Sequence, residues 1–416
     1  MTENRSDHVY DKIFVARQPI FTQDMQIWGY ELLFRHGENA QAALITDNDQ
    51  ATTQVIADGF TLASQGLRKR AKALINFPRN VLVGSAPYVL PPERCVVEIL
   101  ETVEPSAEVL DACLELKRKG YVLALDDFVG EPGFEPLCEL ADIIKVDILH
   151  RKPTEVMDVV KGLDRYKAVL LAEKVESLDM FKVCQRLGFV YFQGFFFSRP
   201  EIIPGRKLSS SQTTKLRILK ELSEEESTQN RLVEIIQADL AISYKLLQYI
   251  NSARFSLCCG ITSIQRAVAL LGRQNLQQWL RVIILSDINS TDKGQELVGM
   301  SARRGRFLQL LSAHHPTPFG PEGMFLLGFF SLLDAILDQA MDAILGTVSL
   351  DSGIKCALTD RQDPNARWIR LLEELERGDW AGLEMQATVM GLPMTLVHIT
   401  ALEASRWAAE VMSSVG

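Results

Sequence analysis

Eight short apolar segments follow one another between residues 12 and 205, and polar or helix-like stretches separate them. The segments are IFVARQPI, WGYELLF, KALINF, CVVEIL, YVLALDDF, DIIKVDI, AVLLAE and FVYFQGFFF. They are rich in β-branched and aromatic residues, which is typical of strands. Between several of them lie amphipathic segments such as SAEVLDACLELKRKG, where Gly120 stands at a helix C-cap position. This alternation predicts a parallel sheet with helices outside, and eight strands in so short a stretch favour an α/β TIM-like barrel over an open sheet.

The chain changes character near residue 205. From Ser209 onward the strand patterns fade, and segments such as SSSQTTKLRILKEL and LQQWLRVIILSDI carry apolar residues at helical spacing. We therefore predict two domains, a barrel over residues 1–207 and an all-α domain over residues 208–416.

Charge and patterning exclude several classes of protein. The formal net charge of −9 argues against a general nucleic-acid binder, which would present a basic face. Three aspartates interrupt the most apolar stretch, from Met324 to Leu350, so we expect no membrane span there. The polar N-terminus does not resemble a signal peptide, and the seven cysteines form no CxxC pair. Free thiols in a reducing compartment are the simplest account, and we expect a cytoplasmic protein.

Polar side chains stand at the ends of the predicted strands. A single one is readily explained as a cap of the following helix, but nearly every unit contributes one or two. In a barrel the carboxyl ends of the strands open on one face, where active sites are built. These residues are Glu31, Asn76, Glu98, Asp126, Asp127, Lys145, Asp147, Glu173 and Gln193.

Clustered carboxylates repel one another unless a cation neutralises them. Oxygen ligands without Cys or His favour Mg²⁺ or Mn²⁺, with Ca²⁺ as an alternative. Two such ions would suit phosphodiester hydrolysis. Lys145 has two interpretations at this stage: it holds a nucleophilic water, or it pairs with a neighbouring carboxylate.

The run QPIFTQDMQIWGYELLFRH resembles the opening of EAL-domain cyclic-di-GMP phosphodiesterases, with ELL in place of EAL. The resemblance continues in order through INF, VVEILE, LALDDF, IIKVD, LAEKVE and FQGFFFSRP, and it covers residues 12–205.

The resemblance implies a role for each matching residue. Glu31, Asn76, Glu98 and Asp126 match ligands of a first metal ion, and Asp126, Asp127 and Glu173 match ligands of a second. Lys145 and Gln193 match residues that position the attacking water, and Gln18 and Arg35 match contacts to the dinucleotide. Glu101 matches a glutamate that steadies the loop after the paired aspartates.

The sequence departs from the family pattern in that loop and beside it. A glycine-rich run is replaced by VGEPGFEP after the two aspartates, and Lys174 stands where the family has glycine. These departures leave two interpretations open: hydrolysis of cyclic di-GMP to linear pGpG, or a domain that binds nucleotide or protein without cleaving. These departures also count against the homodimer through the barrel that the resemblance implies.

The second half resembles the HDOD domain, through ADLAISYKLLQYINSARF, ITSIQRAVALLG and FLLGFFSLLDAIL. Catalytic relatives carry a His-Asp pair where this chain has Ser331 and Leu332. The resemblance therefore implies a non-catalytic module that contacts an unidentified protein partner, in a signalling protein without nucleic-acid or membrane partners. An unrelated barrel glycosidase using Glu98 and Glu173 is the remaining alternative, and it leaves Asn76 and Lys145 unexplained.

Overall fold

We describe a computed structural model of the chain, which divides into two compact units. One unit comprises residues 1–194 and 375–379, and the other comprises residues 195–374 and 380–416. The predicted boundary at residues 207 and 208 lies outside the described residues. The structure describes residues 13–36, 60, 71–84, 86–127, 133–198, 210–222, 229–252, 255, 261–346, 348 and 350–414.

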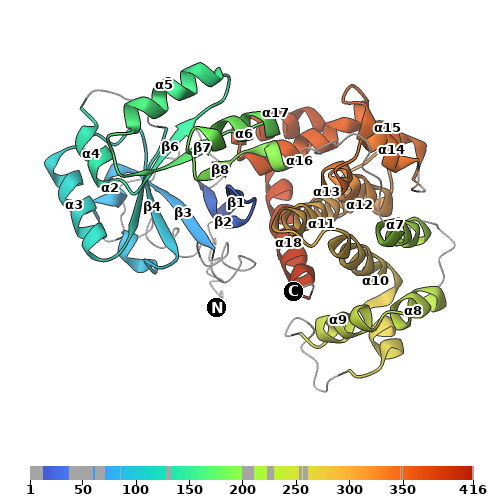
Figure 1. The fold of residues 1–416 in the computed structure, drawn as a ribbon. Helices are drawn as coiled ribbons and strands as arrows, with labels where there is room; N and C mark the ends of the chain where they lie inside the picture. The colour runs from blue at the N-terminus through green and yellow to red at the C-terminus, as the bar shows by residue number, and fades with distance from the viewer. Residues whose placement is uncertain are drawn as a thin grey trace, which may run out of the picture. The chain divides into compact units, whose positions relative to one another are not determined.

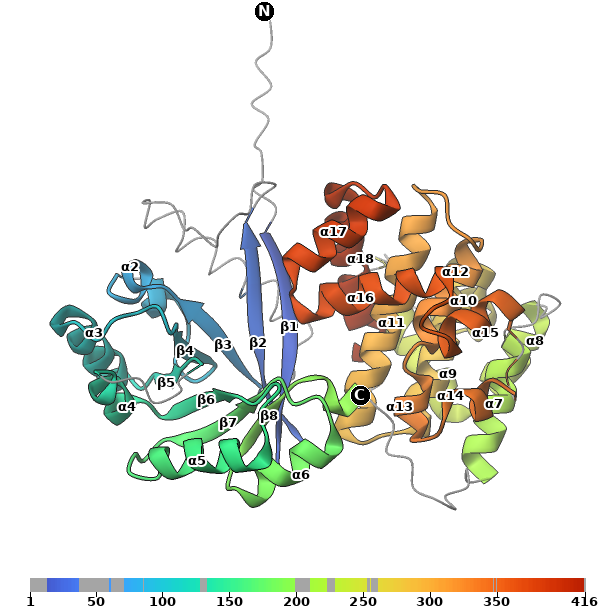
Figure 2. The ribbon, with the colours of Figure 1, turned by 90° about the horizontal axis from the view of Figure 1, so that it is seen from above.

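Within the described residues, the first unit is a closed barrel whose strands follow one another in chain order (Figures 1 and 2). The predicted α/β barrel followed by an all-helical region is therefore confirmed. The strands are β1 (Ile13–Thr22), β2 (Ile27–His36), β3 (Lys72–Phe77), β4 (Cys95–Ile99), β5 (Val122–Leu125), β6 (Ile143–Asp147), β7 (Val169–Glu173) and β8 (Tyr191–Gln193).

The prediction of a wholly parallel sheet is wrong at β1. This strand pairs antiparallel with β2 and with β8, whereas the pairs from β2 to β8 are parallel. The reason is the short link from Thr22 to Ile27, which suffices for a hairpin but not for a parallel crossover. The last predicted strand is also shorter than expected, because Phe195–Ser198 form the 3₁₀ helix η2.

Among the described residues, two adjacent layers of side chains lie inside the barrel. The first is an apolar layer whose members are 0–2% exposed: Ile20, Leu74, Val96, Ala124, Ile143 and Leu171. Side chains two positions apart on a strand point to the same face. The residues two positions further along β3, β4, β6 and β7 are Asn76, Glu98, Lys145 and Glu173, and Asp126 follows β5 in the same way. On the antiparallel strand β1 the order is reversed, so Gln18 precedes Ile20. The strand period therefore lays a polar layer directly on the apolar core.

Helix α3 (Ala107–Arg118) follows the capping rules at both ends. In α3 the Ser106 side chain accepts a hydrogen bond from the Val109 amide, and Gly120, at φ +86°, follows the helix in the left-handed conformation. The amides of Gly120 and Tyr121 then donate to the carbonyls of Lys117 and Leu116, so the predicted C-cap is confirmed. The helices are α2 (Arg79–Leu82), η1 (Ala86–Val89), α3 (Ala107–Arg118), α4 (Glu135–Leu140), α5 (Pro153–Leu163) and α6 (Leu178–Arg186).

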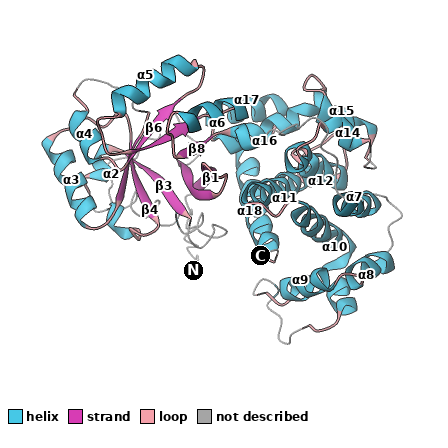
Figure 3. Cartoon of the chain, in the orientation of Figure 1, coloured by secondary structure: helices cyan, strands magenta, loops and turns pink. Residues whose placement is uncertain are grey.

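In the second unit the described secondary structure beyond η2 is entirely helical (Figure 3). Its helices α11 and α12 approach closely because Gly305 and Gly328 face the opposing backbone; a Cβ on Gly328 would lie 2.5 Å from the Arg304 carbonyl. The helices are α7 (Ser210–Leu222), α8 (Gln229–Gln237), α9 (Leu240–Ile250), α10 (Ile264–Ile288), α11 (Asp292–Ser312), α12 (Pro321–Phe330), α13 (Leu333–Leu337), α14 (Met341–Leu345), α15 (Ser352–Thr359), η4 (Pro364–Ala366), α16 (Arg367–Arg377), α17 (Trp380–Met390) and α18 (Met394–Ser413). The last three residues of α16 belong to the first unit.

Among the described residues, no single helix is long and apolar enough to cross a membrane; α17 and α18, bent by 113° at the break between them, meet that test of length and composition only as a pair. The described cysteines are free thiols: Cys95, Cys113, Cys138, Cys184 and Cys356.

Candidate metal centre

Lys145 is the central charge of the polar layer. Its side chain is 1% exposed, and Nζ lies 2.8 Å from Asp126 Oδ1, 2.8 Å from Glu173 Oε1 and 3.7 Å from Glu31 Oε2. Nζ also donates a hydrogen bond to Glu98 Oε1. The pairing of Lys145 with neighbouring carboxylates is thus observed, and β2, β4, β5 and β7 each bring one carboxylate to the same amine.

Amide side chains fix the carboxylate of Glu31. Gln193 Nε2 donates to Glu31 Oε2 at 2.5 Å and to Gln18 Oε1 at 2.7 Å, and Asn76 Nδ2 donates to Glu31 Oε1 at 3.4 Å. Gln18 and Glu31 are register partners on β1 and β2, while β8 closes the barrel beside β1. The structure therefore brings Gln18 and Gln193, far apart in the chain, to one carboxylate.

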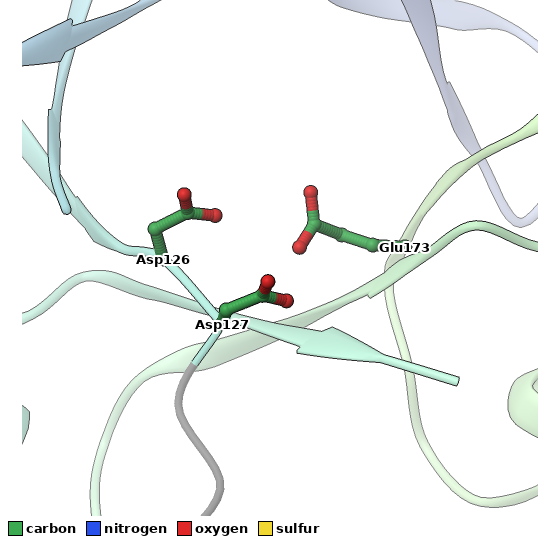
Figure 4. Close-up of side chains that lie close together, drawn as sticks. All are labelled: Asp126, Asp127 and Glu173. Atoms are coloured by element: carbon green, nitrogen blue, oxygen red, sulfur yellow. The ribbon is translucent and has the colours of Figure 1, made fainter. Parts of the chain in front are cut away.

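Asp126, Asp127 and Glu173 form a compact acidic group. One oxygen from each lies within 4.8 Å of the others, and the three carboxylates turn toward one space (Figure 4). Asp126 and Asp127 follow the end of β5, and Glu173 ends β7. Asp127 has φ +42°, a conformation uncommon for a residue with a side chain, and this bend directs consecutive carboxylates into the same group.

Several buried oxygens of this layer lack a hydrogen-bond donor. Within the described residues they are Asn76 Oδ1, Glu98 Oε2, Asp127 Oδ1 and Gln193 Oε1. Buried acceptors are normally paired, so an unpaired set at one strand edge fits the binding of a cation. All four are hard oxygen donors, which suits Mg²⁺ or Mn²⁺. The residues present therefore fit the predicted divalent ions.

Burial and mutual repulsion perturb the acids of this layer. Burial raises the pKa of Glu98 well above its usual range, and Lys145 only partly opposes the rise. Burial likewise raises the pKa of Glu173 to about 8, with Lys145 opposing and the charges of Asp126 and Glu31 adding to the increase. Burial also raises the pKa of Asp127. The positive charge of Lys145 alone therefore does not balance the negative charge of these carboxylates.

Three predicted features are not among the contacts described for this layer. Glu101 is exposed in the turn after β4. Arg35 lies on β2, opposite Phe14 in register, but its side chain is outside the described part of the chain. The departing loop over residues 128–132 also lies outside it. The roles of Glu101 and Arg35 stay predictions.

Two charged residues beside the layer had no predicted role: Asp147 was noted only as a polar residue at a strand end, and Lys174 only as a departure from the family pattern. Lys174 Nζ lies 2.5 Å from Asp147 Oδ2 and 3.9 Å from Asp127 Oδ2. Asp147 is the register partner of Glu173 and stands two positions after Lys145 on β6. The strand period therefore predicts that its side chain lies on the same face as that of Lys145. Lys174 directly follows Glu173, and its departure from the family pattern was the available sign.

In the helical unit, Ser331 and Leu332 are engaged in packing and hydrogen bonding. Ser331 Oγ donates to the Gly328 carbonyl at 2.7 Å and accepts from Arg304 at 2.8 Å. Leu332 is 4% exposed. These two positions thus serve the junction of α12 and α13.

Both halves of the chain match known families, and two relatives are similar to it over most of its length. Residues 10–200 match the EAL domain and residues 208–333 match the HDOD domain. The chain is 35% identical over 401 residues to the cyclic di-GMP phosphodiesterase CdgJ of Vibrio cholerae, covering 96% of this chain and 93% of that protein. It is 33% identical over 378 residues to an uncharacterized protein of Bacillus subtilis, YuxH, covering 89% and 92%.

Solved structures are also similar to part of the chain. BlrP1 of Klebsiella pneumoniae, in a complex with calcium and cyclic di-GMP, is 25% identical with a TM-score of 0.39, covering 48% of this chain and 58% of that one. A standalone EAL protein of Vibrio cholerae O395 in its c-di-GMP-bound form is 24% identical with a TM-score of 0.37, covering 45% and 92%.

Proposed function

The chain belongs to the family of proteins in which an EAL domain is followed by an HDOD domain, and from this premise we propose that its barrel is a metal-dependent cyclic-di-GMP phosphodiesterase. The observation that carries the proposal is the polar layer, in which carboxylates from four strand units surround Lys145 while buried oxygens lack donors. The name of the relative CdgJ, similar along both halves, supports the same activity.

The donor set divides into two parts. Glu31, Asn76, Glu98 and Asp126 would hold one divalent ion, and Asp127 and Glu173, sharing Asp126, would hold the other. When bound, two such ions supply Lewis-acid polarisation of the phosphodiester and activation of water.

The chain's own residues orient these groups. Gln193 Nε2 fixes Glu31 and Gln18 through its two hydrogen bonds. The three N–H groups of Lys145 Nζ face Glu98, Asp126 and Glu173; once ions bind these carboxylates, Nζ would donate to an attacking water or a developing negative charge. Gln18 and Arg35 would contact the dinucleotide.

The reaction opens one phosphodiester of the cyclic dinucleotide. Water supplies the new oxygen on phosphorus, the bond from phosphorus to the 3′ oxygen breaks, and the departing 3′ oxygen takes a proton. The product is linear pGpG. No oxidant or further reactant is needed.

The helical unit completes the proposal as a partner-binding module without catalysis of its own. Its Ser331 hydroxyl is already committed to Gly328 and Arg304. Such a module would couple the barrel to a protein partner in the cytoplasm.

Single-turnover hydrolysis of cyclic di-GMP by the full chain, with Mn²⁺ or Mg²⁺, tests the proposal alongside a binding titration. Cleavage should disappear with chelator and in Glu31→Ala, and it should persist in Glu115→Ala, which removes an exposed carboxylate from α3. Binding without cleavage would instead make the barrel a receptor. The absence of both would refute the proposal and leave a scaffold.

A further inference from the structure

Lys174 adopts a backbone conformation that is unfavourable for its residue type. It directly follows β7, and its φ is +53°, in the left-handed region that a Cβ disfavours. This bend carries the side chain toward the ends of β5 and β6, where Nζ lies 2.5 Å from Asp147 Oδ2 and 3.9 Å from Asp127 Oδ2. A strained backbone thus presents a lysine to two carboxylates.

Asp147 anchors this lysine. Its Oδ1 accepts a hydrogen bond from the Leu149 amide at 2.7 Å, and its carbonyl accepts one from Arg151 Nε at 2.7 Å. The other carboxylate oxygen is therefore directed to Lys174. Lys174 Nζ donates a hydrogen bond to this oxygen, Asp147 Oδ2, at 2.5 Å. A lysine ammonium carries a positive charge at neutral pH.

Lysines thus reach every member of the Asp126–Asp127–Glu173 group. Lys145 lies 2.8 Å from Asp126 and from Glu173, and Lys174 lies 3.9 Å from Asp127. The two lysines differ in freedom, because the Lys145 side chain is 1% exposed and that of Lys174 is 51% exposed. Lys174 can withdraw into solvent, whereas Lys145 cannot.

We propose that Lys174 is a resident counter-cation of the Asp126–Asp127–Glu173 group and weakens its affinity for the second divalent ion. The inference rests on the proposed function, since it assumes that these carboxylates take an ion. A positive charge near Asp127 repels a divalent cation and competes for the same oxygens. The two ions therefore bind with unequal affinity, and occupancy of the second responds to the free concentration of the metal.

The simpler interpretation is a half-exposed ion pair between Lys174 and Asp147 with no influence on the metal. Exposed ion pairs of this kind contribute little to the free energy of folding. The two interpretations differ in one measurable respect: only a competing cation changes the affinity of the acidic group when its charge is removed.

Mn²⁺ binding to the full chain distinguishes the two interpretations. Electron paramagnetic resonance measures the concentration of free Mn²⁺, and titration calorimetry measures the affinity of each ion. Lys174→Met removes the charge and retains the unfavourable backbone, while Lys174→Arg retains the charge. Lys161→Met, on the exposed face of α5, removes one charge from the barrel surface as the matched control.

In Lys174→Met the second Mn²⁺ should bind about tenfold more tightly, the order expected for a unit charge acting on a divalent ion across several Å of water-like medium. The first ion, and both ions in Lys174→Arg and Lys161→Met, should bind as in the unsubstituted chain. Two ions bound with affinities that Lys174→Met does not change would overturn the inference and leave the proposed function intact. Absence of Mn²⁺ binding in every variant would overturn both.

Discussion

At the scale of single residues, Lys145 retains its charge in a setting where burial alone would remove it. Burial lowers the pKa of Lys145, but Glu173, Glu31, Glu98 and Asp126 raise it well above the usual value. The same carboxylates, left without the lysine, would repel one another in a medium of low dielectric constant. Lys145 therefore holds the polar layer together while no divalent ion is bound.

Lys145→Met is expected to destabilise the metal-free protein by about 3–5 kcal/mol, the cost of removing one partner from a buried ionic cluster. Mn²⁺ should reduce this loss, because bound ions replace the missing positive charge. Urea denaturation of the full chain in chelator and in Mn²⁺ measures both effects. A metal-free loss no larger than that of Lys161→Met, an exposed lysine on α5, would contradict the prediction.

The candidate site was largely accessible from the sequence, because strand period and common strand direction place residues reliably. Glu98, Asp126, Lys145 and Glu173 were expected at one edge, and the structure brings them together. The approach of Lys145 to four carboxylates was not accessible, since it depends on barrel curvature. Nor was the contact of Lys174, since that residue reaches Asp147 through a left-handed backbone that no side-chain pattern encodes.

At the scale of elements, the turn after β8 depends on a glycine. Gly194 has φ +140°, and a Cβ there would lie 2.3 Å from the Val175 carbonyl oxygen and 2.4 Å from its nitrogen. The Val175 amide donates to the Gln193 carbonyl at 2.9 Å, joining this turn to the segment after β7. The close approach therefore positions Gln193 against Glu31.

Gly194→Ala is expected to cost about 3 kcal/mol or more, because both positive φ and contact with rigid backbone oppose the Cβ. Gly188→Ala is the matched control: it also has positive φ, at +94°, but nothing lies within 4 Å of its added Cβ. That change should cost only about 1–2 kcal/mol. Equal losses of unfolding free energy in urea would show that the contact with Val175 is unimportant.

At this scale, the sequence pattern was sufficient to locate the strands but not to predict the direction of every one. All eight strands were located from their apolar segments, and the predicted parallel direction is confirmed for the pairs from β2 to β8 but not for β1. The four residues between Thr22 and Ile27 contained the missing information about β1. In the helical unit, Gly272, the last residue of ITSIQRAVALLG, interrupts the helical backbone of α10 at φ +72°.

Helix α13 contains an acid whose environment opposes its ionisation. Burial raises the pKa of Asp334 above its ordinary 3.8, and its hydrogen bond from the Ala335 amide and the charge of Arg304 oppose the rise only in part. The folded state therefore holds this proton more tightly than the unfolded state. Its destabilising effect is present above the folded pKa and disappears as the pH falls through that value toward 3.8.

Asp334→Asn should accordingly stabilise the chain at pH 7, by about 1.4 kcal/mol for each unit by which the pKa is raised. The advantage should vanish near pH 4. Melting temperatures across this range test the sign. Asp342→Asn, at an exposed position of α14, removes the same charge and should show no such pH-dependent gain. A stabilisation by Asp334→Asn that grows toward low pH would contradict the assignment.

At the scale of the whole molecule, the negative charge of the chain opposes the binding of a negatively charged dinucleotide. The protein carries a formal net charge of −9, and this total includes the carboxylates at the strand edge of the barrel, which Lys145 and Lys174 contact in the described part of the chain. A cyclic dinucleotide brings two further negative charges. Divalent ions at this edge would offset both, so metal loading should precede nucleotide binding.

The two units differ in what a divalent ion can stabilise, because the unpaired oxygens and the acidic group described above belong to the barrel. Mn²⁺ should therefore slow amide hydrogen exchange several-fold in peptides containing the ends of β4, β5 and β7, since bound ions suppress local opening there. Peptides from α10, α11 and α12 should exchange at unchanged rates. Glu98→Gln, which removes a buried carboxylate charge from β4, should abolish the protection. Equal protection of α11 would mean that ion binding is sensed by both units, and protection retained in Glu98→Gln would place the ion elsewhere.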